Sequence, residues 1–260
     1  MQRRAFFRSL IAAVGITQLT HVAAASALDE GALGKEVFLT LQEDGEILFD
    51  SPYYEHLNEV GRIISATVAS RYPYPIRFYI VKGESANAFS VPGGYIYVNE
   101  PLLRLAKNRD ELGGVLAHET GHMVLHHVAK RIKNENIIGG IGTIAQILGQ
   151  IFLGPIASIG SSYALDTAAT AQDLNVSRHI EAQADEEGAR IAAATNVLNP
   201  YGLIWFFRTM TEVYGDKGSL WLRSHPLDRA RIADLEHLFA ATPEVFGKFD
   251  ATDKRDIAYW

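Results

Sequence analysis

The sequence predicts an α+β fold in which a mostly helical body carries a small antiparallel sheet over one central helix. Apolar residues recur at helical spacing over 54–71 and 109–132, and two runs rich in β-branched and aromatic residues, 76–81 and 88–98, are typical of strands. No Pro/Ser-rich linker or internal repeat interrupts residues 28–260, and this length can bury one sizeable core. We therefore expect a single domain over 28–260.

Residues 1–27 are expected to be a signal peptide. Arg3, Arg4 and Arg8 precede an apolar run, and an Ala-Ser-Ala site for cleavage ends just before Leu28. The paired arginines leave both the general secretory route and the twin-arginine route open. Either route predicts an exported, periplasmic protein, and the alternative to cleavage is an N-terminal membrane anchor.

Composition narrows the chemistry that a site can use. The 260 residues include no Cys, so disulfides, thiolate metal sites and a lipid-bearing N-terminal Cys are excluded. Without the three early arginines the chain has 21 basic and 30 acidic residues, a formal charge of −9. This balance gives no indication of nucleic-acid binding. Histidine and carboxylate side chains remain as metal ligands.

The first part of the mature chain contains one predicted hairpin, one helix and two strands. Residues 36–48 alternate loosely around Asp44-Gly45, which favours a small hairpin, and residues 54–71 form an amphipathic helix. A proline interrupts the run 88–98, and because proline cannot donate a ladder hydrogen bond, this run is expected at a sheet edge or bulge. An extended peptide can add itself to such an edge. The predicted substrate-binding edge strand consists of Phe89, Ser90, Val91, Pro92, Gly93, Gly94 and Tyr95. The alternative is a hairpin that only packs near the central helix.

The strongest functional signal is the HExxH array formed by His118, Glu119 and His122. Side chains four apart lie on one face of a helix, so both histidines can point a nitrogen at one metal ion. Glu119 is then placed to accept a proton from an attacking water. Asn108 and Glu111 supply a helix cap and a capping box upstream, so the motif is expected within one helix over 109–132.

Two neighbouring histidines do not fit as a third ligand. At about 100° per residue, a continuous helix places His127 opposite His118, and His126 about a quarter turn away. We therefore interpret His127 as a packing histidine and His126 as either solvated or hydrogen-bonded to a ligand. The third ligand must come from elsewhere in the chain.

Residues 137–165 hold no charged residue over 29 positions but include six glycines, two glutamines and a proline. This composition disfavours a transmembrane helix. A buried helix, a mobile lid over the cleft and a membrane-surface hairpin remain open for this segment.

Glu181 and Asp185 lie four apart in a helix that is expected to begin near Asn175. A zinc site with two histidines needs a third ligand, often a carboxylate, and a metal-bound imidazole needs an acceptor for its other N–H. This pair is suited to both tasks. The alternative is a solvated acidic face over 181–187.

Four stretches together resemble one enzyme family: NAFSVPGGYI at 87–96, ELGGVLAHETGH at 111–122, SRHIEAQAD at 177–185 and SHPLDRARI at 224–232. The chain is similar over 54–238 to the HtpX-like and Ste24-type zinc metallopeptidases, which are of gluzincin type, and to their small exported bacterial members. The resemblance implies that His118, His122 and Glu181 bind one Zn²⁺ per chain, that Glu119 is the catalytic base and that Asp185 supports a ligand histidine. The chain departs from the family pattern at Thr120, at 100–103 and at Gln183, where the family usually has a second Glu. None of these departures removes a ligand.

His225 is a candidate fourth ligand. The proline that follows it favours an extended backbone, which can present the imidazole at a fixed angle. In the open metal position His225 would hold the enzyme latent; a catalytic role or simple packing are the alternatives. The candidates for assisting the metal at the oxyanion are Arg178, Tyr201, Arg229 and Arg231, which the sequence does not rank.

The motifs thus predict a zinc metalloendopeptidase. The resemblance implies misfolded or unassembled envelope proteins as substrates, and contact with the membrane surface or the envelope assembly machinery stays open. The competing hypothesis is a zinc-stabilised chaperone or assembly factor that binds envelope proteins with little or no cleavage.

Overall fold

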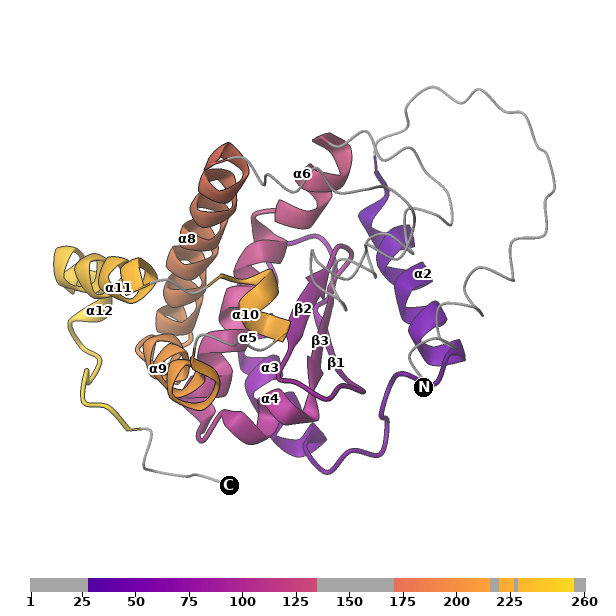
Figure 1. The fold of residues 1–260 in the computed structure, drawn as a ribbon, viewed down its shortest axis with the longest axis horizontal. Coiled ribbons are helices and arrows are strands. Elements are labelled where there is room, and N and C mark those ends of the chain that lie inside the picture. Colours follow the sequence, from indigo (N-terminus) through magenta and orange to yellow (C-terminus); the bar gives the residue numbers. More distant parts are fainter. Residues whose placement is uncertain (1–27, 135–170, 216–219, 227–228, 255–260) are drawn as a thin grey trace.

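The computed structural model describes residues 28–134, 171–215, 220–226 and 229–254 (Figure 1). The signal peptide predicted at 1–27 and the predicted lid or membrane segment at 137–165 lie outside these residues. No helix in the described ranges is both long and apolar enough to cross a bilayer. The elements, in chain order, are α2 (Glu30–Glu43), α3 (Tyr54–Val68), β1 (Arg77–Val81), β2 (Ala88–Val91), β3 (Tyr95–Asn99), α4 (Glu100–Leu105), α5 (Arg109–Val124), α6 (His127–Asn134), α8 (Ala171–Ala194), α9 (Gly202–Tyr214), α10 (Leu220–Ser224), α11 (Arg229–Ala241) and α12 (Pro243–Phe246).

Helix α5 is the central element of the fold and carries the HExxH array. Its N-terminus is capped as the sequence predicts, because the Asn108 side chain accepts hydrogen bonds from the backbone N–H groups of Asp110 and Glu111. The helix packs against α3, α8, α9 and β2 (Figure 1). Every residue from Glu111 to Met123 is buried. Polar side chains on this helix therefore lie in the interior, where each needs a partner.

The sheet has three strands in the order β1-β3-β2. It is mixed, whereas the sequence predicted a purely antiparallel sheet. Gly93 and Gly94, both with positive φ near 90°, close a tight turn that makes β2 and β3 antiparallel. Strand β3 then inserts between its two predecessors. Since each strand reverses the direction of the one before it in sequence, β3 runs parallel to β1. Strand β2 consequently lies at an edge of the described sheet, as the proline predicts.

The two faces of the sheet pack against different helices. Ile80, Ala88, Ile96 and Val98 belong to the core shared with α3 and α5. The alternate residues, including Phe89, Val91, Tyr95 and Tyr97, pack against α2 on the opposite face. This period of two is the pattern of a sheet buried on both sides. The sheet thus lies between α2 and the central helix (Figure 1).

Helix α2 replaces the hairpin predicted over 36–48, which was wrong. The Asp29 side chain accepts from the N–H of Ala32 at 3.0 Å and caps the helix. Leu33, Val37 and Leu41, spaced four apart, bury one stripe against the sheet. The Asp44-Gly45 turn therefore follows a helix, and the chain beyond it makes one isolated antiparallel bridge, Ile47 with Val81.

The predicted continuous helix over 109–132 is broken after Val124. His126 adopts a positive φ of 56°, which a helix cannot accommodate, and α6 begins at His127 in a new direction. His126 Nδ1 lies 2.7 Å from Glu30 Oε1 of α2, and the other oxygen of Glu30 accepts from the Tyr72 hydroxyl at 3.0 Å. Contacts from distant parts of the chain thus stabilise the break.

Helices α5 and α8 approach each other closely because glycine occupies both sides of their contact. A β-carbon on Gly188 would lie 2.8 Å from the backbone nitrogen of His118, and one on Gly121 would lie 2.9 Å from the Ala184 carbonyl oxygen. Both distances are too short for a real side chain. The close backbone approach brings Glu181 and Asp185 of α8 beside the HExxH histidines.

Candidate metal centre

Four buried side chains converge beside the centre of α5: His118 and His122 of α5, Glu181 of α8, and His225 immediately after α10. Each offers one ligand atom, and these four atoms lie within 4.8 Å of one another. Three imidazole nitrogens and one carboxylate oxygen form a donor set that suits zinc. The residues therefore fit the metal ion that the HExxH array implies.

Glu181 lies between the two HExxH histidines and presents one oxygen to each. Its Oε2 is 3.5 Å from His118 Nε2, and its Oε1 is 3.6 Å from His122 Nε2. The two histidine nitrogens are themselves 3.1 Å apart. Burial opposes the charged carboxylate, but neighbouring histidines, His225 and His122 first, hold the pKa of Glu181 well below its usual value.

We call His118, Asp185 and Arg231 the charged side of the site. Asp185 Oδ1 lies 2.9 Å from His118 Nδ1, and the Arg231 guanidinium donates to both Asp185 oxygens at 2.7 and 2.8 Å. Arg231 also lies 3.3 Å from Glu181 Oε2 and stacks over the Phe207 ring at 4.6 Å. The Asp185 carboxylate thus lies against the second ring nitrogen of His118, and a bidentate arginine holds the orientation of the carboxylate.

The charged side shifts the pKa values of its members. Burial lowers the pKa of His118, but hydrogen bonds to Asp185 and Glu181 outweigh it and raise the value to about 9 in the metal-free chain. Burial likewise opposes ionisation of Asp185, yet Arg231 holds the pKa of Asp185 below its usual value. The charged side therefore favours the protonated form of His118.

We call His122, His127 and Gln183 the neutral side of the site. His122 Nδ1 lies 3.0 Å from His127 Nδ1, and His127 Nε2 lies 3.2 Å from Gln183 Oε1. Burial lowers the pKa of both histidines, that of His122 by the larger amount. The prediction that His127 packs on the far side of the helix is wrong, because the break at His126 turns α6 back toward the site. His126 itself is partly exposed and contacts Glu30 rather than a ligand.

Glu119 points one oxygen at α10 and leaves the other without a partner. Its Oε1 accepts from the Trp221 indole N–H at 3.1 Å and lies 3.3 Å from His225 Nε2. Its Oε2 is buried and has no hydrogen-bond partner within the described part of the chain. A buried carboxylate oxygen without a partner is costly unless a water or substrate atom meets it, so this oxygen marks where a reactant would bind.

His225 occupies the fourth corner of the cluster. Its Nδ1 lies 3.0 Å from Glu181 Oε2 and 3.3 Å from His118 Nε2. Its N–H donates to the Trp221 carbonyl at 2.7 Å, so the residue continues the last turn of α10 rather than starting an extended loop. The rings of Trp221 and His225 pack together at 5.1 Å, and the carbonyl of His225 accepts from Arg231 at 3.3 Å.

Of the four candidates for assisting at the oxyanion, Arg231 is the one that the described contacts place in the site. Arg178 is exposed, and the ring of Tyr201 packs on Phe239 at 4.7 Å. The side chain of Arg229 lies outside the described residues. Arg231 is held by Asp185 and by carbonyl oxygens, which indicates a positioning role for it.

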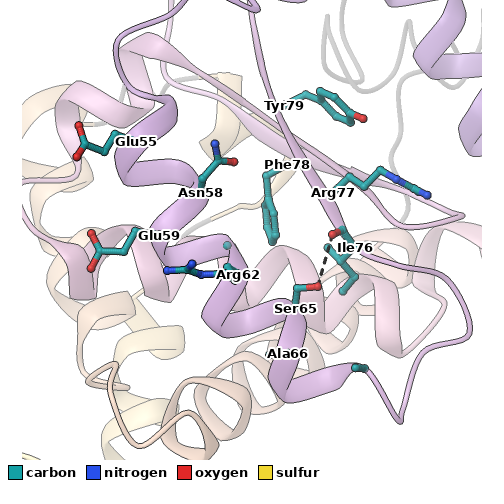
Figure 2. Close-up of a pocket in the computed structure, with 12 residues that line it drawn as sticks. Glu55, Asn58, Glu59, Arg62, Ser65, Ala66, Ile76, Arg77, Phe78 and Tyr79 are labelled. Atoms are coloured by element: carbon teal, nitrogen blue, oxygen red, sulfur yellow. Dashed lines mark hydrogen bonds between the residues drawn. The ribbon is translucent and has the colours of Figure 1, made fainter.

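The predicted edge strand lies beside the site. Ser90, Val91 and Pro92 line a small hollow that also includes His122 and Met123. All seven residues from 89 to 95 are buried, so substrate binding at this edge stays a prediction. A separate open depression lies between α3 and β1, where Glu55, Glu59, Arg62 and Arg77 mix both signs of charge (Figure 2). None of its lining residues belongs to the metal-ligand cluster.

The sequence did not predict the position of two residues of the site, Trp221 and His127. Trp221 is 102 positions from Glu119, and a tryptophan in a short apolar stretch carries no signal for such a bond. His127 was considered but placed wrongly. Only knowledge of the helix break at 126 would have placed His127 correctly, and no glycine or proline marks that break in the sequence.

A helix-borne HExxH pair, a glutamate from a second helix and a buried carboxylate with one oxygen free of hydrogen bonds are typical of a metallopeptidase active site. Residues 55–239 match Peptidase family M48, and the chain belongs to this family. This match bears out the resemblance seen in the sequence motifs.

The chain is also similar to named proteases over most of its length. It is 26% identical over 221 residues to the beta-barrel assembly-enhancing protease of Yersinia pestis, covering 83% of this chain and 45% of the relative. The corresponding protein of Escherichia coli is 23% identical, covering 79% and 42%. The mitochondrial metalloendopeptidase OMA1 of Schizosaccharomyces pombe is 26% identical, covering 82% and 60%. The chain therefore spans about half the length of these relatives.

Proposed function

We propose that this metalloprotease is a zinc-dependent endopeptidase that hydrolyses peptide bonds of envelope proteins. The observation that carries the proposal is the buried cluster of His118, His122 and Glu181 beside the partnerless oxygen of Glu119. A metal site with only a structural role would not need a carboxylate oxygen without a hydrogen-bond partner beside its ligands.

In this proposal His118, His122 and Glu181 hold one zinc ion. When bound, zinc supplies a Lewis acid that lowers the pKa of water and polarises a carbonyl group. The residues of the chain orient the reactants around it. Asp185 fixes the ring of His118, and the close contact of α5 and α8 fixes the carboxylate of Glu181.

Glu119 is the proposed general base. Its Oε1 is held by the Trp221 indole, so the carboxylate cannot rotate freely, and Oε2 is the oxygen available to accept the proton of the attacking water. The same side chain would then return that proton to the leaving amine, as a general base and acid does in turn.

Proteins of the bacterial envelope are the proposed substrates, with misfolded or unassembled chains as the preferred state. Two observations support this choice: the N-terminal 27 residues have the pattern of a signal peptide, and relatives are named beta-barrel assembly-enhancing proteases. An exported protein would meet such chains in the periplasm.

The test is the Glu119→Gln variant of the purified protein, because it removes only the base. We expect it to retain about one zinc per chain and to lose cleavage of casein or of an unfolded β-barrel protein by several orders of magnitude. Glu186→Gln, on the exposed face of α8, is the matched control and should cleave like the wild type. Full proteolysis by Glu119→Gln would refute the proposed mechanism.

One observation favours the competing function of a zinc-stabilised assembly factor. His225 fills the fourth corner of the cluster, which a catalytic site would leave to water, and its Nε2 lies 3.3 Å from Glu119 Oε1. The Glu119→Gln variant separates the two functions. An assembly factor requires that this variant still support envelope assembly in a strain lacking the wild-type gene, whereas a protease requires that it fail.

A further inference from the structure

The neutral side of the site and His179 form a chain of hydrogen-bonding groups that runs from His122 to the surface. We call this chain the relay. It passes from His122 to His127, from His127 to Gln183, and from Gln183 to His179 at 3.1 Å. His122 and His127 are buried, at 6% and 8% exposure, whereas Gln183 and His179 are exposed. All four residues lie on α5, α6 and α8, so three helices contribute to one chain.

The donor and the acceptor of each hydrogen bond in the relay follow from the position of the proton on His122. If His122 Nε2 faces the other ligand atoms with its lone pair, the ring proton must be on Nδ1, which then donates to Nδ1 of His127. His127 must in turn carry its proton on Nε2 and donate it to the Gln183 oxygen. The Gln183 NH₂ group is left to donate to His179 Nε2. One tautomer of each ring satisfies every bond.

We propose that His127 and Gln183 are positioning residues that fix the ring orientation and the tautomer of His122. This inference rests on the proposed function, since it assigns His122 to the metal. His127 accepts the Nδ1 proton of His122, and Gln183 keeps the accepting nitrogen of His127 unprotonated by binding its other N–H. Neither residue touches the metal position.

The broken helix is what makes this contact possible. In a continuous helix His127 would lie about half a turn from the ligand face, out of reach of His122. The positive φ of His126 redirects the chain, and the Glu30 carboxylate and the Tyr72 hydroxyl stabilise that conformation. A packing residue would need no such redirection, and apolar contact alone would not align two ring nitrogens at 3.0 Å.

Gln183 also explains how the relay differs from the charged side. A carboxylate lies 2.9 Å from the second ring nitrogen of His118, whereas a neutral imidazole lies 3.0 Å from that of His122. The amide of Gln183 extends this neutral arrangement without adding charge. The sequence departs from the family pattern at Gln183. The amide oxygen of Gln183 can nevertheless accept the Nε2 proton of His127.

The test compares zinc affinities of the full chain, measured by competition with a chelator. His127→Leu keeps volume but removes the acceptor, and we expect about a 10–100-fold loss of affinity. His127→Asn places an amide oxygen near the Nδ1 position and should recover most of that loss. His237→Leu is the control, because it makes the same exchange at an exposed histidine of α11, outside the site; its affinity should equal the wild-type value.

A second readout reports the tautomers directly. Long-range ¹H–¹⁵N correlation spectra of the zinc-loaded protein should show the proton on Nδ1 of His122 and on Nε2 of His127. A proton on Nδ1 of His127, or unchanged zinc affinity in a folded His127→Leu variant, would overturn the relay. If the wild type bound no zinc, the proposed function would fail instead, and the same spectra of the metal-free chain would still decide the relay.

Discussion

The charged side and the neutral side of the site hold two chemically identical histidines by different means. His118 is held by the carboxylate of Asp185, which is itself held by the bidentate Arg231. His122 is held by the uncharged ring of His127 and, beyond it, by an exposed amide. The first arrangement raises the pKa of the histidine, and on the second side burial lowers it.

This difference separates two requirements of a metal site. A basic imidazole binds a metal strongly but also binds a proton strongly, whereas a neutral one with a low pKa stays available at every physiological pH. With one histidine of each kind, we expect the charged side to govern most of the pH dependence of metal binding. We expect the neutral side to fix the orientation of its histidine.

The largest expected effect comes from the residue shared by both sides. Glu181→Ala removes an oxygen facing each histidine and should abolish stoichiometric zinc binding, measured by metal analysis after dialysis. Asp185→Ala leaves the ligands in place and should reduce zinc affinity about 10–100-fold. Full zinc occupancy in Glu181→Ala would show that the third ligand lies elsewhere.

Asp185→Ala should also destabilise the metal-free chain, which His127→Leu should not do to the same extent. Removing Asp185 leaves the buried Arg231 without its bidentate partner, and breaking a buried pair in this way costs about 3–5 kcal/mol. Denaturant unfolding of both metal-free variants measures the contrast. Equal losses of unfolding free energy would mean that the two sides differ less than their charges indicate.

The pH dependence of zinc binding should follow the charged side. The folded, metal-free chain holds a proton on His118 up to a pKa of about 9, above the ordinary value of 6.5. That proton stabilises the metal-free fold fully below about pH 6.5, and this contribution is lost as the pH rises through 9. Zinc must displace it, so apparent affinity should rise about tenfold per pH unit across this window.

Competition titrations at pH 7, 8 and 9 measure this slope. The control is Asp185→Ala, which removes the group that raises the pKa of His118 most directly and should flatten the dependence above pH 7. An affinity that levels off near pH 6.5 in the wild type would contradict the assignment of the proton to His118.

The smallest effect concerns His225, which the charged side holds through Arg231. If His225 blocks the reactive position, His225→Ala should raise basal cleavage of a short peptide several-fold, because a ligand that competes with substrate has been removed. A catalytic role predicts slower cleavage, and packing alone predicts a lower melting temperature with unchanged cleavage. Reduced cleavage by a well-folded variant would reject latency.

The sequence predicted the parts of the site that depend on local spacing. His118 and His122, and likewise Glu181 and Asp185, are each four apart in one helix, and regular helices preserve that geometry. The HExxH helix, its Asn108 cap and the helix over 54–71 were found for the same reason. Arg231 was found only as one of four unranked candidates, because its partner lies 46 positions away.

The predictions failed where distant contacts decide the local conformation. The helix break at His126 depends on contacts with Glu30 and Tyr72, so the sequence near residue 126 does not predict it. The parallel pairing of β1 depends on β3 inserting between two earlier strands. In contrast, α2 was missed although its signals were present: the Asp29 cap lies outside the window 36–48 that suggested a hairpin.

The glycine contact between α5 and α8 means that this site is preorganised. The backbones of Gly121 and Gly188, rather than adjustable side chains, set the distance between the helices that carry His118, His122 and Glu181. A preorganised site has already lost its conformational entropy when the protein folds. The zinc ion that we propose would then bind to a receptor whose shape the backbone already sets, and it would have to displace the proton that His118 holds.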